Sequence, residues 1–157
     1  MLSQESTAKI DREIAKYPAE QKQSAVMAAL RIAQDELGWL SSETIDFVAA
    51  YLGMAPVAVY EVATFYNMYN LKPVGKYKIT VCTNLSCTLV GSDGIAAHMK
   101  KKLGVGFGET TGDGRFTLKE GECMGACGDG PLFLINNKRM CGFLTAERVD
   151  QILAELE

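Results

Sequence analysis

The sequence has 157 residues, of which 48% are hydrophobic, 22% charged and 8% aromatic, a composition typical of a folded chain of one or two domains. Its net charge of −3 argues against a nucleic-acid-binding role. The chain has no apolar run long enough to span a bilayer, so we expect no direct membrane insertion. The acidic N-terminal residues do not resemble a signal or transit peptide, and we therefore expect a cytoplasmic location.

The first part of the chain predicts four short helices. Their apolar side chains recur at helical spacing over residues 10–17, 26–37, 45–52 and 59–66. Ser41 or Ser42 is suited to cap the third helix, and Pro56 is suited to the first turn of the fourth. Pro73 and Gly75 then interrupt the pattern. We expect a small helical bundle over residues 1–74, which serves mainly in assembly, and a second domain over residues 75–157.

The period of the pattern changes in the second domain. Tyr77, Ile79 and Val81 alternate with polar residues, as in a strand. A helix capped by Ser92 and ending at Gly104 should follow, and then a Gly-rich loop. The remaining expected elements are strands at residues 116–118 and 132–135, a turn at 136–137 and a helix capped at residue 145. The order β-α-β-β-α predicts an α+β protein in which two helices cover a small open sheet.

The five cysteines all lie in this second domain. An odd number, in a chain without an export signal, favours metal binding or redox chemistry over a disulfide framework. Cys82 and Cys87 follow the first strand, and Cys123 and Cys127 follow the second. Because the carboxyl ends of neighbouring strands meet at one edge of a sheet, we expect these four thiols to come together.

The spacing of the four cysteines favours a [2Fe–2S] cluster. The gaps of four and three residues are wider than the common zinc knuckle, and each pair can bind one iron of a binuclear cluster. Small residues crowd the second pair, where backbone N–H groups can approach sulfur. A zinc-bound interaction module, a thioredoxin-like dithiol and plain buried cysteines remain alternatives at this point.

Other candidate residues carry no comparable pattern. Cys141 follows the third strand and is interpreted as a small buried hydrophobic residue. His98, the only histidine, is expected on the surface or partly packed and not as a ligand, and no catalytic residue is assigned. The glycines of residues 104–108 lack the dinucleotide-binding pattern, and we expect no NAD binding by this chain alone.

The aromatic residues near the end of the fourth helix indicate that this helix has two apolar faces. Tyr66 falls on the apolar stripe and is expected in the core. Phe65 and Tyr69 fall on a second face at i and i+4. A second apolar face on a short helix indicates a partner surface or an interdomain contact.

Four segments together resemble a known family. They are VYEVATFY at residues 59–66, CTNLSC at 82–87, CMGAC at 123–127 and LTAERV at 144–149. In this order, and spread over essentially the whole chain, they resemble the E-type subunits of bacterial NADH:quinone oxidoreductase. The mitochondrial counterpart of that family is the 24 kDa subunit of respiratory complex I.

The resemblance implies a helical bundle followed by a thioredoxin-like domain with one [2Fe–2S] cluster. It carries the four ligand positions over to Cys82, Cys87, Cys123 and Cys127, and assigns no role to Cys141. It also implies a partner flavoprotein subunit that holds the FMN and binds NADH, other subunits of the complex, and a peripheral arm on the cytoplasmic side of the inner membrane. Related subunits occur in NAD-linked formate dehydrogenases and NAD-reducing hydrogenases, and the cysteine pattern does not separate these assemblies.

Overall fold

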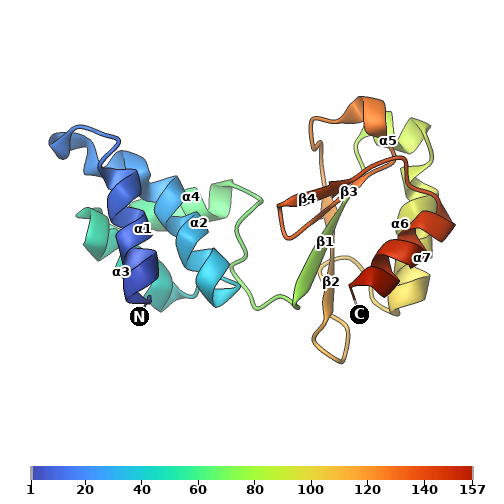
Figure 1. Cartoon of the computed structure of the whole chain (residues 1–157), viewed down its shortest axis with the longest axis horizontal. Coiled ribbons are helices and arrows are strands. Elements are labelled where there is room, and N and C mark those ends of the chain that lie inside the picture. The colour runs from blue at the N-terminus through green and yellow to red at the C-terminus, as the bar shows by residue number, and fades with distance from the viewer. Residues whose placement is uncertain (1, 157) are drawn as a thin grey trace. The chain divides into compact units, whose positions relative to one another are not determined.

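The computed structural model describes residues 2–156 (Figure 1). The chain divides into two compact units, Met1–Pro73 and Val74–Glu157, which are called the N-terminal and C-terminal units below. The first contains only helices, and the second contains the sheet, so the predicted α+β class is confirmed.

The N-terminal unit contains the four predicted helices and one further helix. They are α1 (Gln4–Ile14), the 3₁₀ helix η1 (Ala19–Ala25), α2 (Val26–Leu37), α3 (Ser42–Leu52) and α4 (Pro56–Phe65). The predicted starts of α3 and α4 are confirmed. The Ser41 hydroxyl caps α3 by accepting from the backbone N–H of Thr44, and Pro56 occupies the first turn of α4. A continuous core of apolar side chains from every helix holds the bundle together, with Ile10, Leu30, Val48 and Val59 fully buried.

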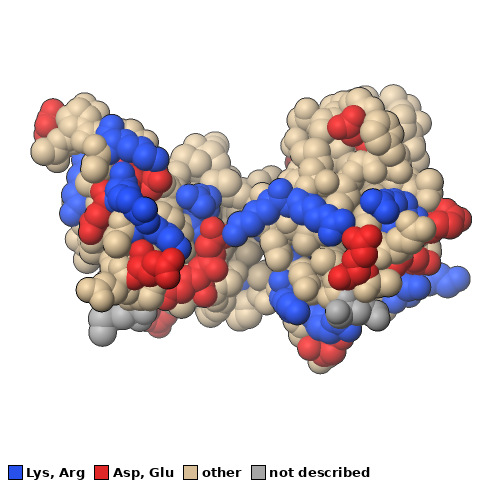
Figure 2. Space-filling view, viewed as in Figure 1, with Lys and Arg blue, Asp and Glu red and all other residues tan. Residues whose placement is uncertain are grey.

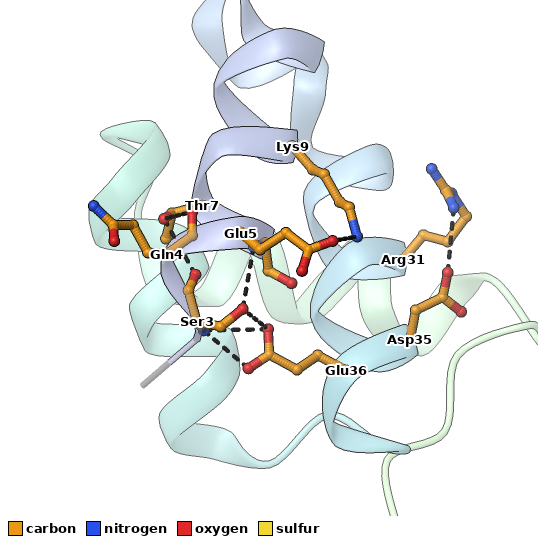
Figure 3. A network of polar contacts seen from close by, with 9 residues as sticks. Ser3, Gln4, Glu5, Thr7, Lys9, Arg31, Asp35 and Glu36 are labelled. Atoms are coloured by element: carbon orange, nitrogen blue, oxygen red, sulfur yellow. Dashed lines mark hydrogen bonds and ion pairs between the residues drawn. The ribbon is translucent and has the colours of Figure 1, made fainter.

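A polar network ties the start of α1 to the end of α2 (Figure 3). The Glu36 carboxylate accepts from the backbone N–H of Ser3 at 2.9 Å and from its hydroxyl at 2.9 Å. The Ser3 hydroxyl in turn caps α1 by accepting from the N–H of Ser6. Hydrogen bonds from the Ser6 side chain and the Ser3 backbone lower the pKa of the Glu36 carboxyl.

The predicted positions of Tyr66 and Tyr69 are wrong: Tyr66 was expected in the core and Tyr69 on a second apolar face. Tyr69 is buried, and its hydroxyl donates to the backbone carbonyl of Met27 at 2.9 Å. Tyr66, expected in the core, is 39% exposed. The reason is that α4 ends at Phe65 and Tyr66 is extended, so helical spacing does not continue to Tyr69. The segment after α4 is held by the Gln34 side chain. Its amide group donates to the carbonyl of Met68 and accepts from the backbone N–H of Asn70.

The C-terminal unit is a four-stranded sheet with its helices. The elements are β1 (Tyr77–Cys82), α5 (Leu85–Leu89), α6 (Ser92–Leu103), β2 (Phe116–Gly121), the 3₁₀ turn η2 (Cys127–Asp129), β3 (Phe133–Ile135), β4 (Arg139–Cys141) and α7 (Ala146–Glu155). The strand order is β2-β1-β3-β4. β1 pairs with β2 in parallel and with β3 antiparallel. Helices α6 and α7 lie together on one side of the sheet (Figure 1).

Three details of this unit differ from the prediction. The short helix α5 was not predicted, and the sheet has four strands where the predicted order has three, because Arg139–Cys141 pairs with β3 as a strand of its own. Cys141 therefore lies in the last strand and does not follow one. Ser92 begins α6 without capping it; the N-cap is Gly91, and the buried Ser92 hydroxyl has no hydrogen-bond partner.

The two faces of β1 differ in character. Ile79 and Val81 are fully buried in the apolar core that includes side chains of α6 and α7. Lys78 and Thr80 alternate with them and so point to the opposite face, where both are also buried. Burial, together with the charge of Lys119, lowers the pKa of Lys78 to about 8.

Within residues 2–156 no single helix is long and apolar enough to cross a membrane. Only α3 and α4 taken as a pair pass that test by length and composition, and they are bent by 119° where they meet.

Candidate metal centre

The sheet brings the two cysteine pairs to one edge. Cys82 is the last residue of β1, and its neighbour in the parallel strand β2 is Gly121, also the last residue of its strand. The backbone N–H of Thr83 donates to the carbonyl of Gly121 at 2.9 Å, so the two chains still run side by side as they leave the sheet. The segment with Cys123 and Cys127 thus begins beside the segment with Cys82 and Cys87, as predicted from the strand ends.

Cys82 and Cys87 form the buried half of the site. Each is 1% exposed, and both pack with Leu132 in a small apolar cluster. The Cys82 thiol donates to the backbone carbonyl of Glu122 at 2.8 Å, a contact that joins the first pair to the chain entering the second. The helix α5, which starts after Asn84, carries Cys87 back toward Cys82.

The pKa of Cys87 reports on the whole cluster of thiols. Burial raises it most, and a hydrogen bond and charge interaction with Cys82 raise it further, to about 11. Charge on Cys127 and Cys123 contributes in the same direction. The Cys87 sulfur therefore lies near enough to each of the other three cysteines to feel their charge. A bound metal ion would stabilise the thiolate form of these cysteines.

Cys123 and Cys127 form the exposed half of the site. Their Sγ atoms are 3.8 Å apart, and the backbone N–H of Gly125 donates to Cys123 Sγ at 3.3 Å. Gly125 has φ +74°, a conformation that disfavours any side chain, and this turn directs its N–H at the sulfur. Hydrogen bonds of this kind stabilise negative charge on a ligating sulfur.

Two further glycines lie in crowded positions near the site. A Cβ on Gly130 would lie 3.3 Å from Cys87 Sγ and 3.0 Å from a methyl carbon of Val90. A Cβ on Gly121 would lie 2.5 Å from side-chain atoms of both Met124 and Thr80. A side chain at Gly130 would therefore crowd Cys87, and one at Gly121 would force Thr80 and Met124 to move.

The close contacts between thiols fall within two pairs. In the described part of the chain, no group of three or more Cys, His, Asp or Glu side chains is already close enough to hold a metal ion. The close contacts are instead within pairs, Cys123 with Cys127 and Cys82 with Cys87. Two pairs of thiolates suit a binuclear [2Fe–2S] cluster.

The remaining candidates lie outside this set. Cys141 is buried in the main core of the C-terminal unit, as predicted, and burial raises the pKa of its thiol. His98 is partly exposed and lies 2.9 Å from the Asp150 carboxylate, which joins α6 to α7.

An apolar rim accompanies the site and was missed by the sequence analysis. Leu85, Leu89 and Val90, on and just after α5, are 70%, 78% and 52% exposed. Phe143 is 69% exposed and has φ +50°, unusual for a bulky residue. Figure 2 shows few charged side chains at the end of the C-terminal unit that carries α5. The sequence did carry a signal for this rim. Three apolar residues lie around Cys87 in a segment that is too short to form a core helix.

Comparison with known proteins shows the family of the chain. Residues 10–157 match the family model of the thioredoxin-like [2Fe–2S] ferredoxins. The E-type subunit of the Rickettsia conorii NADH-quinone oxidoreductase is 47% identical over 145 residues, which are 92% of this chain and 86% of that protein. Subunit 2 of the Thermus thermophilus NADH-quinone oxidoreductase is 37% identical over 147 residues, 94% of this chain and 81% of that one.

The chain is also similar to a mitochondrial protein and to a solved hydrogenase structure. The mitochondrial NADH dehydrogenase [ubiquinone] flavoprotein 2 of Dictyostelium discoideum is 43% identical over 137 residues, which are 87% of this chain and 56% of that protein. Among solved structures, the air-oxidised NAD⁺-reducing [NiFe]-hydrogenase aligns with a TM-score of 0.72 at 22% identity. That alignment covers 83% of this chain but only 22% of the hydrogenase chain, and at this identity it shows the fold alone. The thioredoxin-like fold implied by the sequence motifs is confirmed.

Proposed function

The chain belongs to the thioredoxin-like [2Fe–2S] ferredoxin family, and from this membership we propose that it is the electron-transfer subunit of an NADH:quinone oxidoreductase. The observation that carries the proposal is the position of two close pairs of thiols just after the ends of two neighbouring parallel strands. The relatives named as subunits of that complex, at 37–50% identity, support the same assignment.

Cys82, Cys87, Cys123 and Cys127 are the proposed ligands. The donor set fits the group, because four cysteine thiolates are the usual ligands of a [2Fe–2S] cluster. When bound, the cluster accepts and releases one electron at a time. The chain itself supplies the thiolates, the Gly125 N–H directed at Cys123, and the apolar packing of Leu132 that keeps water from the buried pair.

The proposed electron partner is the flavoprotein subunit that holds FMN and binds NADH. Cys123 and Cys127 are exposed, and the uncharged rim of Leu85, Leu89, Val90 and Phe143 offers a surface on which another subunit can pack without desolvating charge. On the N-terminal unit, Phe65 is 80% exposed beside a hollow of about 500 Å³ lined by Glu61, Val62, Thr64 and Tyr66. We assign this hollow to assembly with other subunits, in a peripheral arm on the cytoplasmic side of the membrane.

A subunit of an NAD-reducing hydrogenase or a formate dehydrogenase is the second candidate. The fold shared with the hydrogenase favours it, but that likeness is at 22% identity, against 47% for the respiratory relative from Rickettsia conorii. The higher identity supports the respiratory complex.

Electron exchange with the flavoprotein tests the proposal. The full chain is reconstituted anaerobically with iron and sulfide and mixed with the flavoprotein subunit of the same complex, and NADH is added. We expect the visible absorption of the cluster to bleach only when both NADH and the flavoprotein are present. Bleaching by NADH without the flavoprotein, or no bleaching with it, would refute the assigned partner.

A further inference from the structure

The two halves of the cysteine site differ sharply in accessibility. Cys123 and Cys127 are exposed, while Cys82 and Cys87 are each 1% exposed. The sulfur atoms of the exposed pair are only 3.8 Å apart although no bond joins them. A small oxidant in solution therefore meets one pair of thiols already in contact with each other and does not reach the other.

We propose that Cys123 and Cys127 form a reversible disulfide in the chain that has not received its cluster. The inference rests on the proposed function only in assuming that the chain passes through a cluster-free state. The co-reactant is a small-molecule disulfide such as oxidised glutathione.

The reaction proceeds by two thiol–disulfide exchanges. One cysteine of the pair, as thiolate, attacks a sulfur of glutathione disulfide; the protein–glutathione bond forms, the glutathione S–S bond breaks, and one glutathione thiolate leaves. The second cysteine then loses its proton and attacks the protein sulfur, which forms the Cys123–Cys127 bond and releases the second glutathione. The protein dithiol loses two electrons and two protons, and glutathione disulfide becomes two glutathione molecules. A reducing thiol reverses both steps.

The segment around the exposed pair has open space on two sides. The bond requires the sulfur atoms to move from 3.8 Å to about 2.0 Å. Gly125 and Gly128 lie within and just after the segment, and an added Cβ at either position would meet no atom within 4 Å. The segment is therefore unobstructed on the sides of these glycines. The buried pair is held differently, by packing on Leu132 and by the hydrogen bond from Cys82 to the Glu122 carbonyl.

The consequence concerns cluster insertion. A disulfide between Cys123 and Cys127 removes two of the four proposed ligands together, and it protects both sulfurs from irreversible oxidation. Because disulfides are rare in reducing compartments, the bond forms there only when the glutathione pool becomes oxidised.

Peptide mapping of the full wild-type chain tests the proposal. The cluster-free chain is incubated with oxidised glutathione, remaining thiols are alkylated, and linked peptides are identified by mass spectrometry. We expect two fewer free thiols, a Cys123–Cys127 link, and full reversal by dithiothreitol. Cys141→Ala, which changes a thiol in the main core, should give the same link, and Cys127→Ala should abolish it. Linkage through Cys82, Cys87 or Cys141, or a glutathione adduct that never closes, would overturn the proposal.

Reconstitution separates this proposal from the proposed function. We expect the oxidised chain to take up no cluster until it is reduced, and the reduced chain to load. If the link forms but the reduced chain binds no iron and sulfide, the disulfide stands and the proposed function fails. If the reduced chain loads a cluster but the exposed pair stays reduced under oxidation, the function stands and the disulfide is refuted.

Discussion

Cys127 and Cys141 are a matched pair of thiols in different settings. Cys127 is exposed beside Cys123 in the site, whereas Cys141 is buried among apolar side chains of β3 and α7. Cys127→Ala should lose most of the [2Fe–2S] cluster, because one iron lacks a ligand. Cys141→Ala should keep the cluster at a cost of about 1 kcal/mol in stability. Iron and sulfide analysis with urea unfolding checks both, and loss of the cluster only in the Cys141 variant would contradict the ligand set.

Lys78 predicts a pH dependence of stability. Its folded pKa of about 8 lies below the unfolded value of about 10.4, so the unfolded chain holds the proton to higher pH than the folded chain. Stability contributed by Lys78 is therefore fully present above pH ~10.4 and is lost as the pH falls toward 8. The difference in unfolding free energy between Lys78→Met and wild type should shift in favour of wild type as the pH rises through this window.

The variant is compared with wild type at each pH because thiol groups also titrate in this pH range. The raised pKa values of Cys87 and Cys141 lower stability as the pH rises, and they do so in both proteins. If the difference in unfolding free energy between Lys78→Met and wild type did not change with pH, the pKa of Lys78 would not be lowered in the folded chain.

At the scale of elements, the glycine at the end of β2 sets the path of the chain into the site. Gly121→Ala should lower stability by about 1–3 kcal/mol and reduce cluster occupancy, because its Cβ would lie 2.5 Å from Met124 and Thr80. Gly94→Ala, on α6 with no atom within 4 Å of the added Cβ, is the control and should raise stability by about 0.5 kcal/mol. Thermal unfolding and absorption spectra of both variants give the answer; equal effects would mean that backbone entropy alone matters at Gly121.

Sequence patterns located most elements because local chemistry fixes them. Ser41 and Thr145 cap α3 and α7 as predicted, since each side chain accepts from a backbone N–H three residues later. The cysteine pairs were placed by the strands that precede them. The short helix α5 has too few residues for a period to be read. Tyr69 donates to the carbonyl of Met27, and the residues on either side of it are hydrogen-bonded to Gln34, in contacts that span more than 30 residues of sequence. Such long-range contacts have no local pattern.

At the scale of the whole molecule, the two units should be separable. All four proposed ligands lie in the C-terminal unit, so a fragment from residue 74 onward should still bind a cluster. It should bind the flavoprotein partner much more weakly than the full chain does, because it lacks the exposed aromatic surface at Phe65. Absorption spectra and co-purification measure the two properties, and a fragment that is insoluble or cluster-free would show that the N-terminal unit mainly stabilises the other.

A single substitution makes the same distinction in the full chain. Phe65 is 80% exposed, so Phe65→Ala should leave thermal stability nearly unchanged while weakening co-purification with the flavoprotein. Leu37→Ala, at a 41% exposed position on α2, serves as the control and should affect neither. Unchanged partner binding with a large fall in stability would refute the assembly role of Phe65.

The binuclear cluster is the central claim, and one set of measurements on anaerobically purified full chain tests it most directly. Iron, acid-labile sulfide and zinc are quantified, and the electron paramagnetic resonance spectrum is recorded before and after dithionite reduction. The account predicts about two irons and two sulfides per chain and an S = 1/2 signal that appears only on reduction. Stoichiometric zinc without sulfide, in a colourless protein, would contradict it.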